Sequence, residues 1–150
     1  MKLARELEKR LERLVDGLSA TVFRGKMHPV DLANRLVRTV DLSVEEGPAG
    51  PTIDNQLTVR VHPGELDADL DIALLERELA TAVADVAAER GWRTGGPIRV
   101  SMAQDNGVGA GSVAVDGMRH PGPLPPWGQL LDAATGRAVE LSDNRIIVGR

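Results

Sequence analysis

A chain of 150 residues, 42% of them hydrophobic, is long enough to bury one core of ordinary size, which predicts one domain with an appendage rather than two full domains. It has no cysteine, which excludes disulfides, thiolate metal sites and a cysteine nucleophile, and one Phe and two Trp leave few platforms for stacking nucleic-acid bases. The net charge of −4 divides unevenly, because residues 1–40 hold nine Lys/Arg against five acids (+4) and the other 110 residues hold nine against 17 (−8).

The first 40 residues predict two helices joined at a corner. Leucines recur every three or four residues from Leu3 to Leu18 between charged residues, which is the pattern of an amphipathic helix. Gly25 is suited to end that helix, and Pro29 is suited to the first turn of the second. The basic residues of this helical hairpin are our candidate partner surface, and the alternative is an ordinary solvated helix face. Those singled out are Arg10, Arg13, Arg24, Lys26 and Arg35.

Farther along, the periodicity changes between that of strands and that of helices. Residues 57–61 alternate apolar and polar as in a half-buried strand, and residues 68–90 carry an apolar face at helical spacing. Two more strands are expected at residues 98–103 and 112–116, with the turn sequence Asp-Asn-Gly at residues 105–107 between them. The first two strands should be parallel, joined by a right-handed crossover through the helix, and the last two should form an antiparallel hairpin.

Together these elements predict an α+β (mixed α/β) fold in the order α-α-β-α-β-β, with a three-stranded mixed sheet packed by helices over residues 1–117. Residues 118–126 hold four of the nine prolines, which indicates a stiff linker and a domain boundary. Residues 127–150 predict three short strands, which cannot form a stable domain without a partner sheet.

No group of residues has the spacing of a catalytic or metal-binding site, so we expect a protein that is not an enzyme and holds no metal or cofactor. The acids of residues 67–78 match the ligand spacing of a calcium loop, but Ile72 stands where that loop needs Gly, and the helix dipole explains acids at a helix start. The glycines of residues 107–111 precede no helix, which favours a flexible hairpin loop over a phosphate cradle. The three histidines lack partners at metal or relay spacing.

The alternative function is nucleic-acid binding by a KH-like module that uses the same basic helical face. A small mixed sheet with helices is the architecture of a KH module, whose backbone clamp needs Gly-x-x-Gly between two helices. The corresponding corner, residues 25–28, contains one glycine, which disfavours this alternative.

Several motifs resemble the N-terminal domain of FhaA-type proteins. They keep the family's order over residues 5–116 and include Phe23-Arg24-Gly25, His28-Pro29-Val30-Asp31, Asn55 just before the first strand, and Gly96-Pro97-Ile98. The sequence departs from the family at Asp54, where proline is common. The resemblance implies a bacterial, typically actinobacterial, cytoplasmic protein in which this domain precedes a forkhead-associated (FHA) domain. It also implies a role in serine/threonine-kinase signalling around cell-wall synthesis or division.

The C-terminal segment is similar to the first strands of an FHA domain. Residues 146–150 resemble the strand that carries its opening Gly-Arg motif. In that family the arginine helps to bind phosphothreonine, so the resemblance assigns this role to Arg150, whose guanidinium matches phosphate oxygens with paired donors. The Ser-Arg-x-x-His and Asn-Gly elements of a complete FHA site are absent, so we expect these 150 residues to be a fragment that does not bind phosphothreonine usefully.

The predicted function is that of a non-catalytic adaptor in phosphothreonine signalling. Its N-terminal domain is expected to bind a protein partner or to self-associate, and a phosphothreonine protein is a partner only if the FHA domain is complete. No stretch approaches the roughly 18 apolar residues of a membrane span, and the charged first helix lacks the apolar run of a signal peptide, which predicts a cytoplasmic protein.

Overall fold

A computed structural model gives the fold and describes residues 5, 9, 13, 27, 29–143 and 146–149. Arg5, Lys9 and Arg13 are helical, and the Nε of Arg13 donates a hydrogen bond to the Lys9 carbonyl oxygen at 3.1 Å. The rest of the predicted first helix lies outside the described residues.

The second and third helices are α2 (Pro29–Leu42) and α3 (Ile72–Arg90). α3 begins later than the predicted residue 68, because Asp71 is its N-cap and accepts a hydrogen bond from the Leu74 N–H at 2.9 Å. Its C-cap is Gly91, which adopts a left-handed conformation with φ 64° and whose N–H donates to the carbonyl oxygens of Ala87 and Ala88. Among the helices of the described residues, none has the length and apolar character needed to cross a bilayer.

The main sheet has three strands in the order β4 (Arg99–Gln104), β2 (Gln56–Val61) and β5 (Val113–Met118). β2 pairs with β4 in parallel and with β5 antiparallel, so the predicted crossover and three-stranded mixed sheet are confirmed. The predicted hairpin between the last two strands is wrong, because they lie on opposite edges of β2. Central placement buries the apolar residues of β2 best, and the connection over residues 105–112 is long enough to pass the end of that strand.

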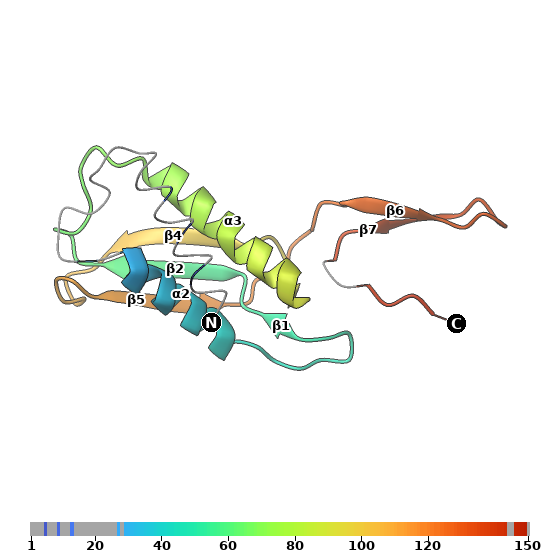
Figure 1. The fold of residues 1–150 in the computed structure, drawn as a ribbon, viewed down its shortest axis with the longest axis horizontal. Coiled ribbons are helices and arrows are strands. Elements are labelled where there is room, and N and C mark those ends of the chain that lie inside the picture. The colour runs from blue at the N-terminus through green and yellow to red at the C-terminus, as the bar shows by residue number, and fades with distance from the viewer. Residues whose placement is uncertain are drawn as a thin grey trace.

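Both helices cover the same face of this sheet, α3 over β4 and α2 over β5 (Figure 1). Leu57, Val59 and Val61 of β2 point toward the helices and are at most 1% exposed. The opposite face is uncovered by any described element and carries polar side chains such as Thr58 and Arg60. The fold is therefore two-layered, and the predicted α+β class and order of elements are confirmed.

A second, very short sheet pairs β1 (Thr52–Ile53) with β3 (Arg93–Thr94) in parallel. The sequence did not predict it, because two residues are too few to show an alternating pattern. β5 extends to Met118, one residue past the end of the predicted first domain. The division into residues 1–117, 118–126 and 127–150 stays a prediction.

The C-terminal residues form an antiparallel hairpin, β6 (Gly128–Leu131) with β7 (Ala138–Leu141), which projects from the α+β domain (Figure 1). The third strand predicted here is wrong for the described residues 146–149, which are in no strand. Trp127 is 65% exposed and Leu131 is 68% exposed. Two strands without a second sheet cannot cover such side chains, as the sequence indicated.

Candidate functional site

The basic residues predicted to form a partner surface are described only in part. Arg13 and Arg35 are exposed, and Arg35 lies on α2. The structure therefore neither shows these residues together on one surface nor contradicts that surface, which stays a prediction. The other predicted site residues lie outside the described residues and are Arg10, Arg24, Lys26 and Arg150.

Asn55, which carries part of the family resemblance, is a fully buried structural residue. Its Nδ2 donates to the carbonyl oxygens of Pro97 at 3.1 Å and His120 at 2.9 Å, and its Oδ1 accepts from the His120 N–H at 2.8 Å. A Cβ on Gly96 would lie 2.7 Å from the His120 carbonyl oxygen and 2.8 Å from the Gly122 nitrogen. We call this arrangement the Asn55 clamp. It joins the starts of β2 and β4 to the chain that leaves β5.

Glu65 is a second buried polar residue with structural contacts. One carboxylate oxygen accepts from the Met27 N–H at 2.9 Å and the other from the Gly111 N–H at 2.6 Å. The loop predicted to be a flexible hairpin loop is thus anchored at Gly111, and Val108 within it is buried. Glu65 therefore takes an N–H that a phosphate cradle would need.

Charged groups on the uncovered face of the sheet are paired with one another. Arg60 contacts Asp105 and Asp116, with nitrogen–oxygen distances of 2.8 Å in both pairs. The hydrogen bond from the Gly107 N–H, followed by the bond from Arg60, holds the pKa of Asp105 below its usual value. The two carboxylates raise the pKa of Arg60. Asp105 and Arg60 therefore remain charged and ion-paired at neutral pH.

The acidic run before α3 is also structural. Asp67 accepts a hydrogen bond from the Asp69 N–H at 3.1 Å, and Asp71 caps the helix, which agrees with the helix-start interpretation for Asp71. Within the ranges that the structure describes, no cluster of three or more His, Asp or Glu residues could hold a metal ion.

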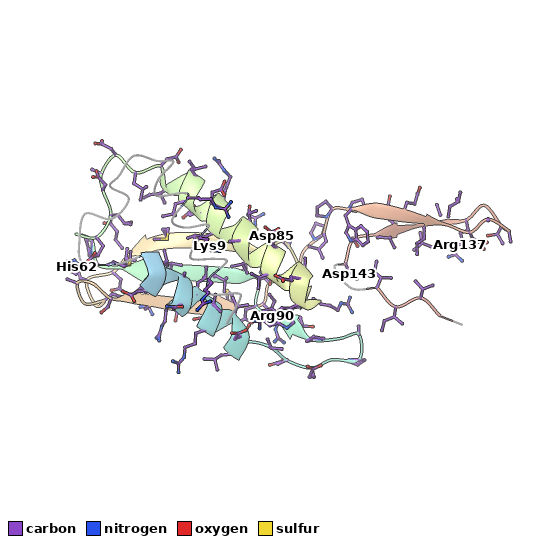
Figure 2. All side chains as sticks on the ribbon, in the orientation of Figure 1. Lys9, His62, Asp85, Arg90, Arg137 and Asp143 are labelled. Atoms are coloured by element: carbon purple, nitrogen blue, oxygen red, sulfur yellow. The ribbon has the colours of Figure 1, made fainter. Side chains whose placement is uncertain are left out.

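The C-terminal hairpin is fastened to the α+β domain near the end of α3. Arg93 of β3 forms an ion pair with Asp143 at 2.9 Å, and the Trp127 indole N–H donates to the Asp143 carbonyl oxygen at 2.9 Å. Figure 2 labels Asp143 at this junction, with Arg90 on the neighbouring end of α3. Arg93 thus ties Asp143, after the hairpin, to the domain, and Trp127 joins the start of the hairpin to the same Asp143.

An open groove of about 400 Å³ lies between α3 and the outer edge of β4. We call it the α3–β4 groove. Its helix side contains two alanines, whose small side chains leave room beside the strand. The lining residues are Ala73, Glu76, Arg77 and Ala80 of α3, and Ile98, Arg99, Val100 and Ser101 in and before β4.

β4 is an edge strand, and its outer backbone groups face this groove. The Arg99 N–H donates to the Asn55 carbonyl oxygen at 2.8 Å, so odd-numbered residues of β4 point their backbone groups toward β2. Even-numbered residues then point theirs away from β2. Glu76 confirms this, because its carboxylate accepts from the outward N–H of Met102 at 2.7 Å. Val100, by the same alternation, directs its N–H and C=O out of the sheet into the groove.

Two arginines give the groove a positive rim. Arg77 and Arg99 are exposed, and neither forms an ion pair with any residue that the structure describes. The groove's carboxylate, Glu76, is occupied by the Met102 N–H. Sequence reasoning missed this site. Its one signal was the pair of alanines seven residues apart on α3, which is common on any exposed helix face.

Comparison with known proteins agrees with the family resemblance that the sequence motifs indicate. The family model described as "FhaA, N-terminal domain" matches residues 4–116. A solved structure titled "Rv0020c_Nter structure" aligns with 74% of this chain and 80% of its own length, at 19% identity and a TM-score of 0.59, which shows a shared fold. No curated protein matches the chain. Because the family model covers most of the sequence, in agreement with the fold, the chain belongs to the family of FhaA N-terminal domains.

Proposed function

We propose that this protein is a non-catalytic adaptor whose FhaA-type domain binds a protein partner through the α3–β4 groove. We place it in the cytoplasm of a bacterium, in phosphothreonine signalling by serine/threonine kinases that bears on cell-wall synthesis or division. Membership of the FhaA N-terminal family supports the signalling context, because members of this family precede FHA domains. A phosphothreonine protein is a second partner when a complete FHA domain follows.

The α3–β4 groove is the observation that carries the proposal. Edge strands are templates for pairing, and proteins usually cover or blunt them. Here α3 covers the edge at Met102 through Glu76, whereas the stretch around Val100 opens into a groove with apolar walls. A strand edge that no described strand covers, beside an apolar groove, is suited to a protein segment.

The polar groups of the domain support a role without catalysis. Asn55 and Glu65, the buried polar residues in the described part of the chain, form hydrogen bonds to backbone groups. Asp105 and Asp116 are paired with Arg60. These contacts hold loops and strands in place.

Nucleic-acid binding gains no support from the described residues. The uncovered face of the sheet offers no aromatic side chain on which a base could stack, and Arg60 at its centre is paired with two carboxylates. Trp92 is buried, with the Arg90 guanidinium 4.8 Å from the centre of its ring. A protein partner therefore fits these surfaces better.

Site-specific photo-crosslinking tests the proposal. A photoreactive amino acid is placed at Ala80 in the groove or at Arg35 on α2, in the full-length protein expressed in the organism that encodes it. We expect a discrete protein adduct from Ala80, with a yield well above that from Arg35. An adduct from Arg35 alone would indicate that the partner binds the predicted basic surface instead of the groove. The absence of an adduct at both positions would contradict the proposed function.

A further inference from the structure

We propose that the α3–β4 groove binds an acidic segment of the partner in extended conformation, which adds as a strand to the edge of β4 that no described strand covers. This inference rests on the proposed function and specifies the chemistry of the ligand. It combines the backbone geometry of β4, the shape of the groove and the charge of its rim.

The backbone of β4 supplies the pairing groups. Val100 points its N–H and C=O into the groove, and a peptide strand can bond both at once. Glu76 already occupies the next outward N–H, that of Met102. The part of the edge that Glu76 does not occupy is therefore short, and a bound strand that extends from Val100 to Met102 must displace the Glu76 carboxylate.

The walls of the groove suit a strand. Side chains of an added strand alternate, so that every second one points between β4 and α3. Ala73 and Ala80 leave space there, while Ile98 and Val100 supply an apolar floor. A strand with an apolar residue at every second position fills the groove without burying a polar group.

The rim selects acidic residues at the intervening positions. Arg99, which pairs with Gln56, points to the uncovered face of the sheet, where the intervening side chains of an added strand also point, and Arg77 lies on the helix side of the groove. Each guanidinium can form two parallel hydrogen bonds to a carboxylate. The carboxylate of Glu76 is turned to the Met102 N–H. The preferred ligand is thus an extended peptide that alternates acidic and apolar residues.

The other edge of the sheet provides a contrast. β5 is accompanied by α2, and the Thr39 hydroxyl donates to the Val115 carbonyl oxygen at 3.4 Å. At the β4 edge the structure shows a groove lined by described residues. Strand addition is therefore expected at that edge.

The test uses a defined probe, the fluorescein-labelled hexapeptide Glu-Val-Asp-Val-Glu-Val, with the full 150-residue chain. Fluorescence anisotropy measures affinity, and amide NMR spectra locate the binding site. We expect saturable binding with a dissociation constant below about 1 mM, largest shifts around Val100 and Ala80, and slowed hydrogen exchange of the Val100 amide. A peptide with lysine at the acidic positions should bind about tenfold more weakly.

Matched variants separate strand addition from general charge attraction. Arg77→Glu with Arg99→Glu should weaken binding about tenfold, whereas Arg38→Glu on α2 should change it less than about twofold. Glu76→Ala should tighten binding, because it frees the Met102 N–H and removes a negative charge. A probe with N-methyl groups at alternate residues should lose binding, because strand pairing needs its N–H groups. Circular dichroism confirms that each variant is folded.

Equal binding of the acidic and lysine peptides, or shifts centred away from the β4 edge, would overturn the inference. The N-methylated probe binding as well as its parent would overturn strand addition. A partner adduct from Ala80 together with no peptide binding would leave the proposed function standing and refute this inference. Peptide binding at Val100 with no adduct from Ala80 would refute the proposed function instead.

Discussion

Among the neutral polar side chains that the structure describes, Asn55 is the one whose replacement with alanine should destabilise the domain most. The substitution removes the hydrogen bonds from Nδ2 to the Pro97 and His120 carbonyl oxygens and the bond from the His120 N–H to Oδ1. Asn55 is 0% exposed, so these partners would lose their hydrogen bonds in a buried site. At about 1 kcal/mol net for each hydrogen bond, the free energy of unfolding should fall by roughly 3 kcal/mol.

Urea unfolding followed by far-UV circular dichroism measures this loss. Thermal unfolding should show a midpoint lowered by roughly 6–12 °C, since about 1 kcal/mol corresponds to roughly 2–4 °C in a protein of this size. Amide exchange should speed up at His120, which loses its acceptor. The matched control is Gln56→Ala, because Gln56 is half-buried and donates one bond of 3.3 Å to the same Pro97 carbonyl oxygen.

The reasoning would be refuted if Asn55→Ala cost less than about 1 kcal/mol, the net value of a single hydrogen bond. It would also be refuted if the Gln56 variant lost as much. Either result would mean that the Asn55 clamp does not hold the chain leaving β5 against the starts of β2 and β4.

Gly96→Ala should destabilise the protein in urea unfolding, because the new Cβ meets backbone atoms at 2.7 and 2.8 Å, whereas Gly95→Ala should be nearly neutral, since no atom lies within 4 Å. Arg60→Gln should raise the pKa of Asp105 in a carboxylate NMR titration. Because the pKa of Asp105 is lower in the folded than in the unfolded protein, Asp105 stabilises the fold above the unfolded value of about 3.8. This stabilisation is lost as the pH falls through the folded pKa. The Arg60→Gln variant should therefore lose less stability on acidification than the unchanged protein does. Arg93→Ala should increase fast motion of the C-terminal hairpin in amide relaxation, and unchanged motion would contradict its fastening role.

Periodicity was enough to predict the elements of the domain but not their arrangement. The alternation of β2 and the apolar stripe of α3 are local, and both elements lie close to where they were predicted. The order of strands depends on which edge of β2 each later strand pairs with. The Asp-Asn-Gly turn at residues 105–107 favours a hairpin locally, and burial of the central strand outweighs that preference.

The candidate groove and the Asn55 clamp could not be predicted from sequence, because both depend on residues far apart in the chain. Asn55 and His120 are 65 positions apart, and nothing local marks them as partners. The groove forms where Ala80 of α3 meets the outward backbone of Val100. Backbone groups carry no sequence pattern, so an edge strand shows itself only when the sheet is assembled.

The measurement that tests the central claim most directly is the yield of partner crosslinked from Ala80, with and without an excess of the acidic hexapeptide. Binding of the partner in the α3–β4 groove predicts a discrete adduct from Ala80 that the acidic peptide suppresses and the lysine peptide leaves unchanged. An adduct from Arg35 with none from Ala80 would contradict the account.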